Sequence, residues 1–219
     1  RGGVSLGGGL VGGAARAVGR VGASGAKGGG VFRERGGGPG KILCTGDTRY
    51  DQVWARAQRP PLALLQSMRS SRPTLVAGST WPSDEVHLFG AWSRIRDKIP
   101  DARLVIAPHE LTAAHIASVE SWARGHDLRI ARINAPDAPD AAVILVDRFG
   151  ILGDLYALAA VAYVGGGFDS PGLPSVLEPA AFGAPVLFGP RNATRRDSAQ
   201  LIGAGCCAAV TGDPARAVG

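Results

Sequence analysis

The sequence predicts an α/β protein built on a doubly wound parallel sheet. From residue 74 onward, short apolar runs alternate with longer amphipathic segments of helical period, which is the pattern of β-α-β units. Most of the short runs are apolar at nearly every position, as expected of strands whose two faces are both covered by helices. Together these two observations indicate a Rossmann-like domain.

The elements follow in order from this alternation. Residues 41–57 read as a short strand, a turn and a helix, and residues 62–68 as a short helical piece. We then expect strands at 74–79, 102–108, 128–133, 142–147, 161–165, 184–189 and 206–210. Helices are expected at 82–99, 111–125, 150–159, 175–183 and 195–205. Pro82 with the acids Asp84 and Glu85 favours the first of these helix starts, and Gly125 and Gly183 favour two of the helix ends.

Composition divides the chain into three parts. Residues 1–40 hold about half of the 33 glycines and show no helical or strand period, so we expect this segment to be disordered. Its G-x-G-x-x-G match at Gly7, Gly9 and Gly12 is expected by chance in so glycine-rich a tract. Residues 41–73 read as a linker or interdomain segment, and residues 74–219 as one domain that we expect to be truncated at its C-terminal end.

Charge and cysteine content exclude several classes of function. The net charge is +6, but most of the excess lies in residues 1–40, so the domain gives no electrostatic reason to expect nucleic acid. The three cysteines form no C-x-x-C pair, which disfavours a disulfide framework or a zinc site and fits a reducing compartment. No apolar run is long enough to span a bilayer, and no metal cluster or Ser-His-Asp order appears.

Ligands of such sheets bind outside the carboxyl ends of the strands, so the candidate site is composed of residues that follow predicted strands. They are Ser79 and Thr80, then Pro108, His109 and Glu110, then Gly150, Ile151 and Leu152, then Gly165, Gly166 and Gly167, and finally Ser175 and Glu178 at the next helix start.

Each group has a structural alternative. Ser79 and Thr80 could cap the helix from Pro82, and Glu110 the helix from Leu111. Ser175 and Glu178 fit the S-x-x-E capping box, although a carboxylate at that position can also accept two ribose hydroxyls. The three glycines turn a corner, or they let a phosphate or carboxylate approach the backbone N–H groups. His109 is either structural or a phosphate donor, whereas packing or solvated roles are expected for His115 and the other two histidines.

Four stretches together resemble the bacterial 3-deoxy-D-manno-octulosonic acid (Kdo) transferases of lipopolysaccharide synthesis. They are "TGDTRYDQV", "IAPHE", "LVDRFGILGDLYALAAVAYVGGGF" and "LPSVLEPAAFGAPVLFGP", and the resemblance covers roughly residues 42–212. It implies the C-terminal, donor-binding domain of a two-domain GT-B glycosyltransferase. The family moves Kdo from CMP-Kdo to a lipid A precursor with inversion and without a bound metal or other cofactor.

The resemblance also implies roles for particular residues. Pro108 and His109 fall in the phosphate-contacting motif, and Gly150, Ile151 and Leu152 in a Gly-Glu-Leu stretch near the cytosine, with Ile in place of Glu. Glu178 matches the glutamate at the ribose, whereas Ser175 and Pro174 depart from the usual Asn and His. The family's catalytic base and acceptor site lie on its N-terminal domain, which nothing here matches, so no residue of this chain is predicted to be catalytic and the chain alone is expected to be inactive.

The expected partners are therefore a nucleotide sugar and, through the N-terminal domain, a lipid A precursor at the cytoplasmic face of the inner membrane. Two other readings stay open from the residues alone. One is a GT-B protein that uses a UDP-sugar, and the other is a non-catalytic nucleotide-binding module.

Overall fold

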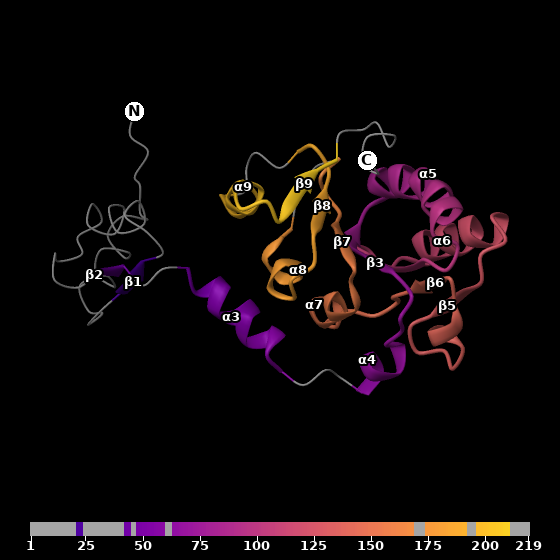
Figure 1. Cartoon of the computed structure of the whole chain (residues 1–219), viewed down its shortest axis with the longest axis horizontal. Coiled ribbons are helices and arrows are strands. Elements are labelled where there is room, and N and C mark those ends of the chain that lie inside the picture. Colours follow the sequence, from indigo (N-terminus) through magenta and orange to yellow (C-terminus); the bar gives the residue numbers. More distant parts are fainter. Residues whose placement is uncertain are drawn as a thin grey trace, which may run out of the picture. The chain divides into compact units, whose positions relative to one another are not determined.

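The computed structural model describes residues 21–23, 42–44, 47–59, 63–168, 174–191 and 196–210. The chain forms two compact units, Arg1–Ala55 and Arg56–Gly219 (Figure 1). In the first unit, strands β1 (Val21–Ala23) and β2 (Ile42–Cys44) pair in parallel, and helix α3 (Thr48–Ala57) begins. Apart from Val21–Ala23, the segment predicted to be disordered, with its glycine motif, lies outside the described residues.

The second unit contains the predicted alternation of strands and helices. Its strands are β3 (Thr74–Thr80), β4 (Arg103–Pro108), β5 (Ile130–Arg132), β6 (Val143–Leu145), β7 (Val161–Val164), β8 (Val186–Phe188) and β9 (Cys207–Ala209). Its helices are α4 (Ala63–Met68), α5 (Pro82–Lys98), α6 (Ala113–Gly125), α7 (Leu152–Leu155), α8 (Leu177–Ala181) and α9 (Arg196–Gly203), with 3-10 turns η2 (Ala138–Asp140) and η3 (Tyr156–Leu158).

All seven strands of this unit run parallel in the order β5-β6-β4-β3-β7-β8-β9. Strand β3 is the first of these seven strands along the chain, yet it lies in the middle of the sheet. Strands β4, β5 and β6 lie on one side of β3, and strands β7, β8 and β9 lie on the other. The order therefore reverses between β3 and β7, which opens a crevice at their carboxyl ends.

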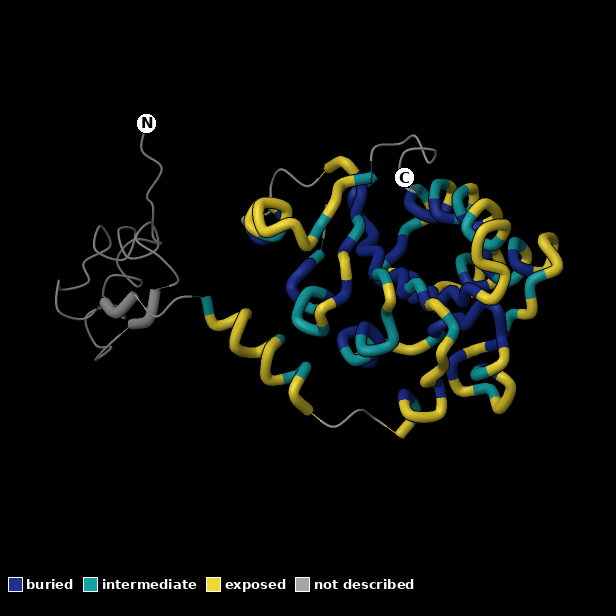
Figure 2. The backbone as a smooth tube through the Cα atoms, viewed as in Figure 1, coloured by how far each residue is buried: buried dark blue, intermediate teal, exposed yellow. Residues whose placement is uncertain are grey.

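Helices cover both faces of the sheet, so the predicted doubly wound architecture is confirmed (Figure 1). One face packs on α5 and α6 through Leu88, Trp92, Ile116 and Val119. The other face packs on α4, α7 and η3, with α8 and α9 packed beside them over β7 and β8. Figure 2 shows the strands as a buried centre, with exposure concentrated on the outer sides of the helices.

Two helices differ from the prediction. The expected helix 150–159 is an α-helical turn, α7, followed by the 3-10 turn η3, because the chain must tighten before Ala159 turns extended into β7. The expected helix 175–183 is only Leu177–Ala181. Both shortened helices lie at the candidate site.

Candidate functional site

The end of β3 turns sharply into α5. Ser79 has a positive φ of 53°, and the register between β3 and β4 shifts between Gly78 and Thr80. Thr80 is fully buried, and its hydroxyl donates to Oε1 of Glu85 at 2.8 Å. The interpretation of Ser79 and Thr80 as helix caps is wrong, because the residue that precedes the helix is Trp81.

The carboxylate of Asp84 organises this turn, a role that the sequence analysis missed. Asp84 is fully buried and accepts three hydrogen bonds: from the Tyr163 hydroxyl at 2.8 Å, from Gly166 N–H at 2.8 Å and from Trp81 N–H at 2.9 Å. Burial, together with the charge of Asp84, raises the pKa of Tyr163. One carboxylate thus joins α5, β7 and the glycine loop. The available signal was an acid at the third position of the helix.

The glycines of the loop after β7 are required by the protein's own backbone. A Cβ on Gly165 would lie 2.3 Å from the carbonyl oxygen of Ser79, and one on Gly167 would lie 2.4 Å from the nitrogen of Gly189. Gly166 has a φ of +87°. Close approach of neighbouring strand ends therefore explains Gly165 and Gly167, and the positive φ explains Gly166, without a ligand.

This packing changes the predicted anion site. Gly165 N–H donates to the carbonyl of Gly78 at 2.9 Å, and Gly166 N–H is held by Asp84. The expectation that these two N–H groups hold a phosphate or carboxylate is therefore wrong. A contact between substrate and other atoms of Gly165, Gly166 or Gly167 stays a prediction.

The end of β4 presents His109 to solvent. Pro108 is buried, whereas His109 and Glu110 are exposed. The His109 ring stacks on Trp81 with centroids 4.5 Å apart, and the backbone N–H of His109 donates to the carbonyl of Thr80 at 2.8 Å. Its availability to a ligand fits the predicted phosphate contact, which stays a prediction.

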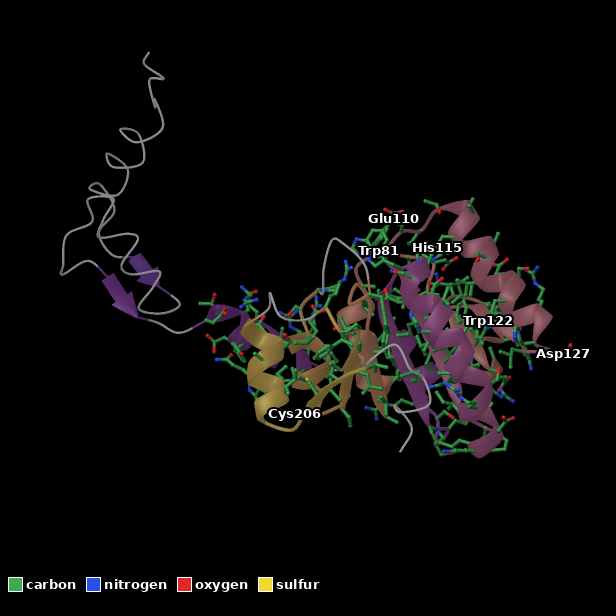
Figure 3. The ribbon with its side chains drawn as sticks, turned by 90° about the horizontal axis from the view of Figure 1, so that it is seen from above. Trp81, Glu110, His115, Trp122, Asp127 and Cys206 are labelled. Carbon is green, nitrogen blue, oxygen red and sulfur yellow. The ribbon has the colours of Figure 1, made fainter. Side chains whose placement is uncertain are left out.

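The helix that follows β4 has a different cap from the one predicted. Thr112, not Glu110, accepts the hydrogen bond from His115 N–H that caps α6. His115 itself reaches across to α5, where its Nε2 lies 2.9 Å and 3.0 Å from the two carboxylate oxygens of Glu85 (Figure 3). Burial raises the pKa of Glu85, while the hydrogen bond from Thr80 and the nearby His115 oppose this shift.

The second half of the site lies where α7 and α8 begin. Gly150 has a φ of +87° and is exposed, Ile151 is buried, and Leu152 starts α7. Leu152 also contacts the end of β3, since a Cβ on Gly78 would lie 2.7 Å from its Cδ1. This contact joins the residues of α7 to those at the β3 and β7 ends in one continuous edge.

Glu178 does not form the predicted capping box. Helix α8 begins at Leu177, after the helical residue Val176, and the Ser175 hydroxyl accepts from Leu177 N–H at 3.3 Å. Glu178 instead lies 3.3 Å from Nη1 of Arg56, with its side chain one-third exposed. The pKa of Tyr156 is raised mainly by the burial of its hydroxyl and further by the charge of Glu178. The Glu178 carboxylate therefore does not cap α8 and remains partly exposed at the edge of the sheet.

Arg56 and Gly153 complete this cluster, and neither was singled out from the sequence. A Cβ on Gly153 would lie 3.2 Å from Oε1 of Glu178, so the α7 segment and the glutamate are in contact despite their distance in the chain.

A separate cavity of about 230 Å³ lies at the amino ends of β3 and β7, lined mainly by apolar residues such as Trp92, Ile95 and Ile99, away from the candidate site.

The described residues contain neither a metal-binding cluster nor a membrane-spanning helix. Across those residues, no group of three or more His, Cys, Asp or Glu could hold a metal ion. None of the described helices is long and apolar enough to cross a membrane.

The sheet order and the helices on both faces define a doubly wound, Rossmann-like domain of the kind found in GT-B glycosyltransferases. Among solved structures, the chain is similar to the C-terminal CMP-Kdo binding domain of WaaA from Acinetobacter baumannii, with a TM-score of 0.52, 19% identity, and coverage of 73% of this chain and 90% of that one. It is also similar to a UDP-N-acetylglucosamine 2-epimerase, with a TM-score of 0.58, 15% identity, and coverage of 92% and 47%. At these identities the likeness shows the fold, which confirms the predicted class.

Sequence comparison is more specific. The chain is 34% identical over 116 residues to 3-deoxy-D-manno-octulosonic acid transferase of Aquifex aeolicus (strain VF5), covering 53% of this chain and 31% of that protein. It is 26% identical over 159 residues to the enzyme of the same name from Rickettsia felis, covering 72% and 34%. No family model matches the chain.

The chain is thus similar in sequence to part of the Kdo transferases and in fold to a CMP-Kdo binding domain, and the resemblance predicted from its motifs is confirmed. It spans about a third of the length of these curated relatives.

Proposed function

We propose that this chain is the donor-binding part of a Kdo transferase, which takes Kdo from CMP-Kdo and transfers it to a lipid A precursor. The observation that carries the proposal is the contact between the two segments that match the family's nucleotide motifs. Gly153, which directly follows Gly150–Leu152, lies against the Glu178 carboxylate at the carboxyl edge of the sheet, since a Cβ on it would lie 3.2 Å from Oε1 of Glu178. Such an edge is where open α/β sheets bind their ligands.

Each residue then has a physical role in holding the donor. The partly exposed Glu178 accepts the ribose hydroxyls, and the loop at Gly150 lies beside the base. The exposed His109 donates to a phosphate oxygen. Fixed donors near the phosphate stabilise the negative charge that develops on CMP as its bond to Kdo breaks.

The transfer itself is proposed to need more than this chain. In the proposal the reaction inverts the anomeric carbon and uses neither a metal nor a cofactor, and the base that activates the acceptor lies on an N-terminal domain. That domain also contacts the lipid A precursor at the cytoplasmic face of the inner membrane. The present chain alone is therefore expected to bind the donor without catalysing transfer.

Calorimetric titration of the chain with CMP, CMP-Kdo and UDP tests the proposal. We expect CMP and CMP-Kdo to bind more tightly than UDP. Glu178→Gln should weaken CMP binding by about tenfold or more, because hydrogen bonds to a charged acceptor are lost. Asp97→Asn, at an exposed position of α5, is the matched control and should bind as the parent chain does. A folded chain that binds UDP more tightly than CMP, or binds neither at millimolar concentration, would contradict the proposal.

A further inference from the structure

Arg56 bridges the two carboxylates at the starts of α7 and α8. Its Nη1 lies 3.3 Å from Oε1 of Glu178, and its Nε lies 3.7 Å from Oδ1 of Asp154. All three side chains are between one-quarter and about one-third exposed, so the cluster is partly shielded from water but open to a ligand. Arg56 is the first residue of the second unit, to which Asp154 and Glu178 also belong.

The guanidinium of Arg56 packs directly against Gly153, where any larger residue would displace it. A Cβ on Gly153 would lie 2.0 Å from Nη1 of Arg56. Gly153 lies in the helical turn α7, and its φ is not positive. The backbone conformation at this position therefore does not require glycine. The absence of a side chain at Gly153 therefore leaves room for the Arg56 guanidinium beside Glu178.

The geometry orients Glu178 without saturating it. A carboxylate offers about four acceptor positions, and the bond from Arg56 takes one of them. A glutamate held in this way has lost most of its rotamer freedom before a ligand arrives, so less entropy is lost when the ligand binds. An acceptor of fixed direction favours a ligand that offers two adjacent hydroxyls over one that offers a single hydroxyl.

We propose that Arg56 is a positioning residue for sugar recognition, which holds the Glu178 carboxylate so that it selects a ribonucleotide over a 2′-deoxyribonucleotide. The inference rests on the proposed function, since it assigns Glu178 to the ribose. It differs from a purely structural role, in which Arg56 would only hold α7 and α8 together, and from a purely electrostatic role, in which its charge would attract any phosphate.

The ratio of affinities for CMP and 2′-deoxy-CMP, measured on the whole chain by calorimetry, separates these roles. We expect the parent chain to prefer CMP, and Arg56→Ala to reduce this preference by about threefold or more, the value of one side chain that must be ordered on binding. Loss of charge alone would weaken both ligands equally and leave the ratio unchanged. Loss of stability alone would lower the unfolding temperature and likewise leave the ratio unchanged.

Two further variants make the test independent of charge. Gly153→Ala should displace the guanidinium while keeping its charge, and should reduce the ratio as Arg56→Ala does. Arg59→Ala removes an exposed arginine three residues further on and should leave the ratio as in the parent chain. If the parent prefers CMP and neither Arg56→Ala nor Gly153→Ala changes that preference, the inference about Arg56 is overturned while the proposed function stands. If the folded parent chain binds no CMP, both are overturned.

Discussion

Removing the Asp84 carboxylate should cost a large part of the domain's stability. Asp84→Ala leaves three donors without their acceptor: the buried Tyr163 hydroxyl, the buried N–H of Gly166 and the partly buried N–H of Trp81. Each unsatisfied buried donor costs about 1–3 kcal/mol, and partial relaxation makes the sum smaller than the parts, so we expect a loss of about 3–5 kcal/mol. The free energy of unfolding in urea, followed by circular dichroism, measures this loss.

Milder changes at the same carboxylate should give graded results. Asp84→Asn keeps one oxygen for the two N–H groups and turns its amide toward Tyr163, whose hydroxyl can rotate to accept, so we expect a loss of about 1–3 kcal/mol. A double-mutant cycle with Tyr163→Phe should give a coupling energy of about 1–2 kcal/mol. The exposed Asp97→Ala is the control. If Asp84→Ala were as stable as Asp97→Ala, the view of Asp84 as the organiser of this edge would be refuted.

Two other expectations concern stability. Gly165→Ala should destabilise the domain by more than about 2 kcal/mol, because its Cβ would meet the backbone of Ser79, whereas Gly90→Ala, in open space within α5, should stabilise it by about 0.5–1 kcal/mol. Urea unfolding measures both, and equal effects would argue against the close packing. Because the pKa of Glu85 is raised in the folded state, that state holds more protons than the unfolded chain, and the Glu85 contribution decreases as pH rises above about 4.5. The stability of the parent chain minus that of Glu85→Gln should therefore fall as pH rises above about 4.5, and a rising difference would reverse the assigned sign.

Prediction from sequence succeeded where the signal was local. The strands β3, β4 and β6 are apolar runs whose burial on both faces is visible in the residues themselves, and the alternation with helices implies parallel connections. The edge that binds ligands follows from those connections, so His109 and Glu178 could be placed at it from the sequence.

Prediction failed where the outcome depended on partners distant in the chain. Ser175 and Glu178 have the spacing of a capping box, but Arg56, from a segment far earlier in the chain, holds the carboxylate instead. The glycines after β7 have the composition of a phosphate loop, but Asp84 and the end of β3 occupy two of their N–H groups. A side chain's neighbours in the sequence do not reveal these competitors.

The sequence by itself therefore determined the class of the fold, the strand ends at which the candidate site lies and the relatives that share its motifs. Hydrophobic period and motif spacing are properties of residues close together in the sequence, so they can be recognised without the folded structure. The tertiary structure alone decided which polar groups remain available to a ligand. Most buried donors and acceptors are paired, and that pairing is settled among residues that only folding brings together. At this edge Asp84 accepts hydrogen bonds from Tyr163 and from two backbone N–H groups, whereas the Glu178 carboxylate, 3.3 Å from Arg56, stays partly exposed.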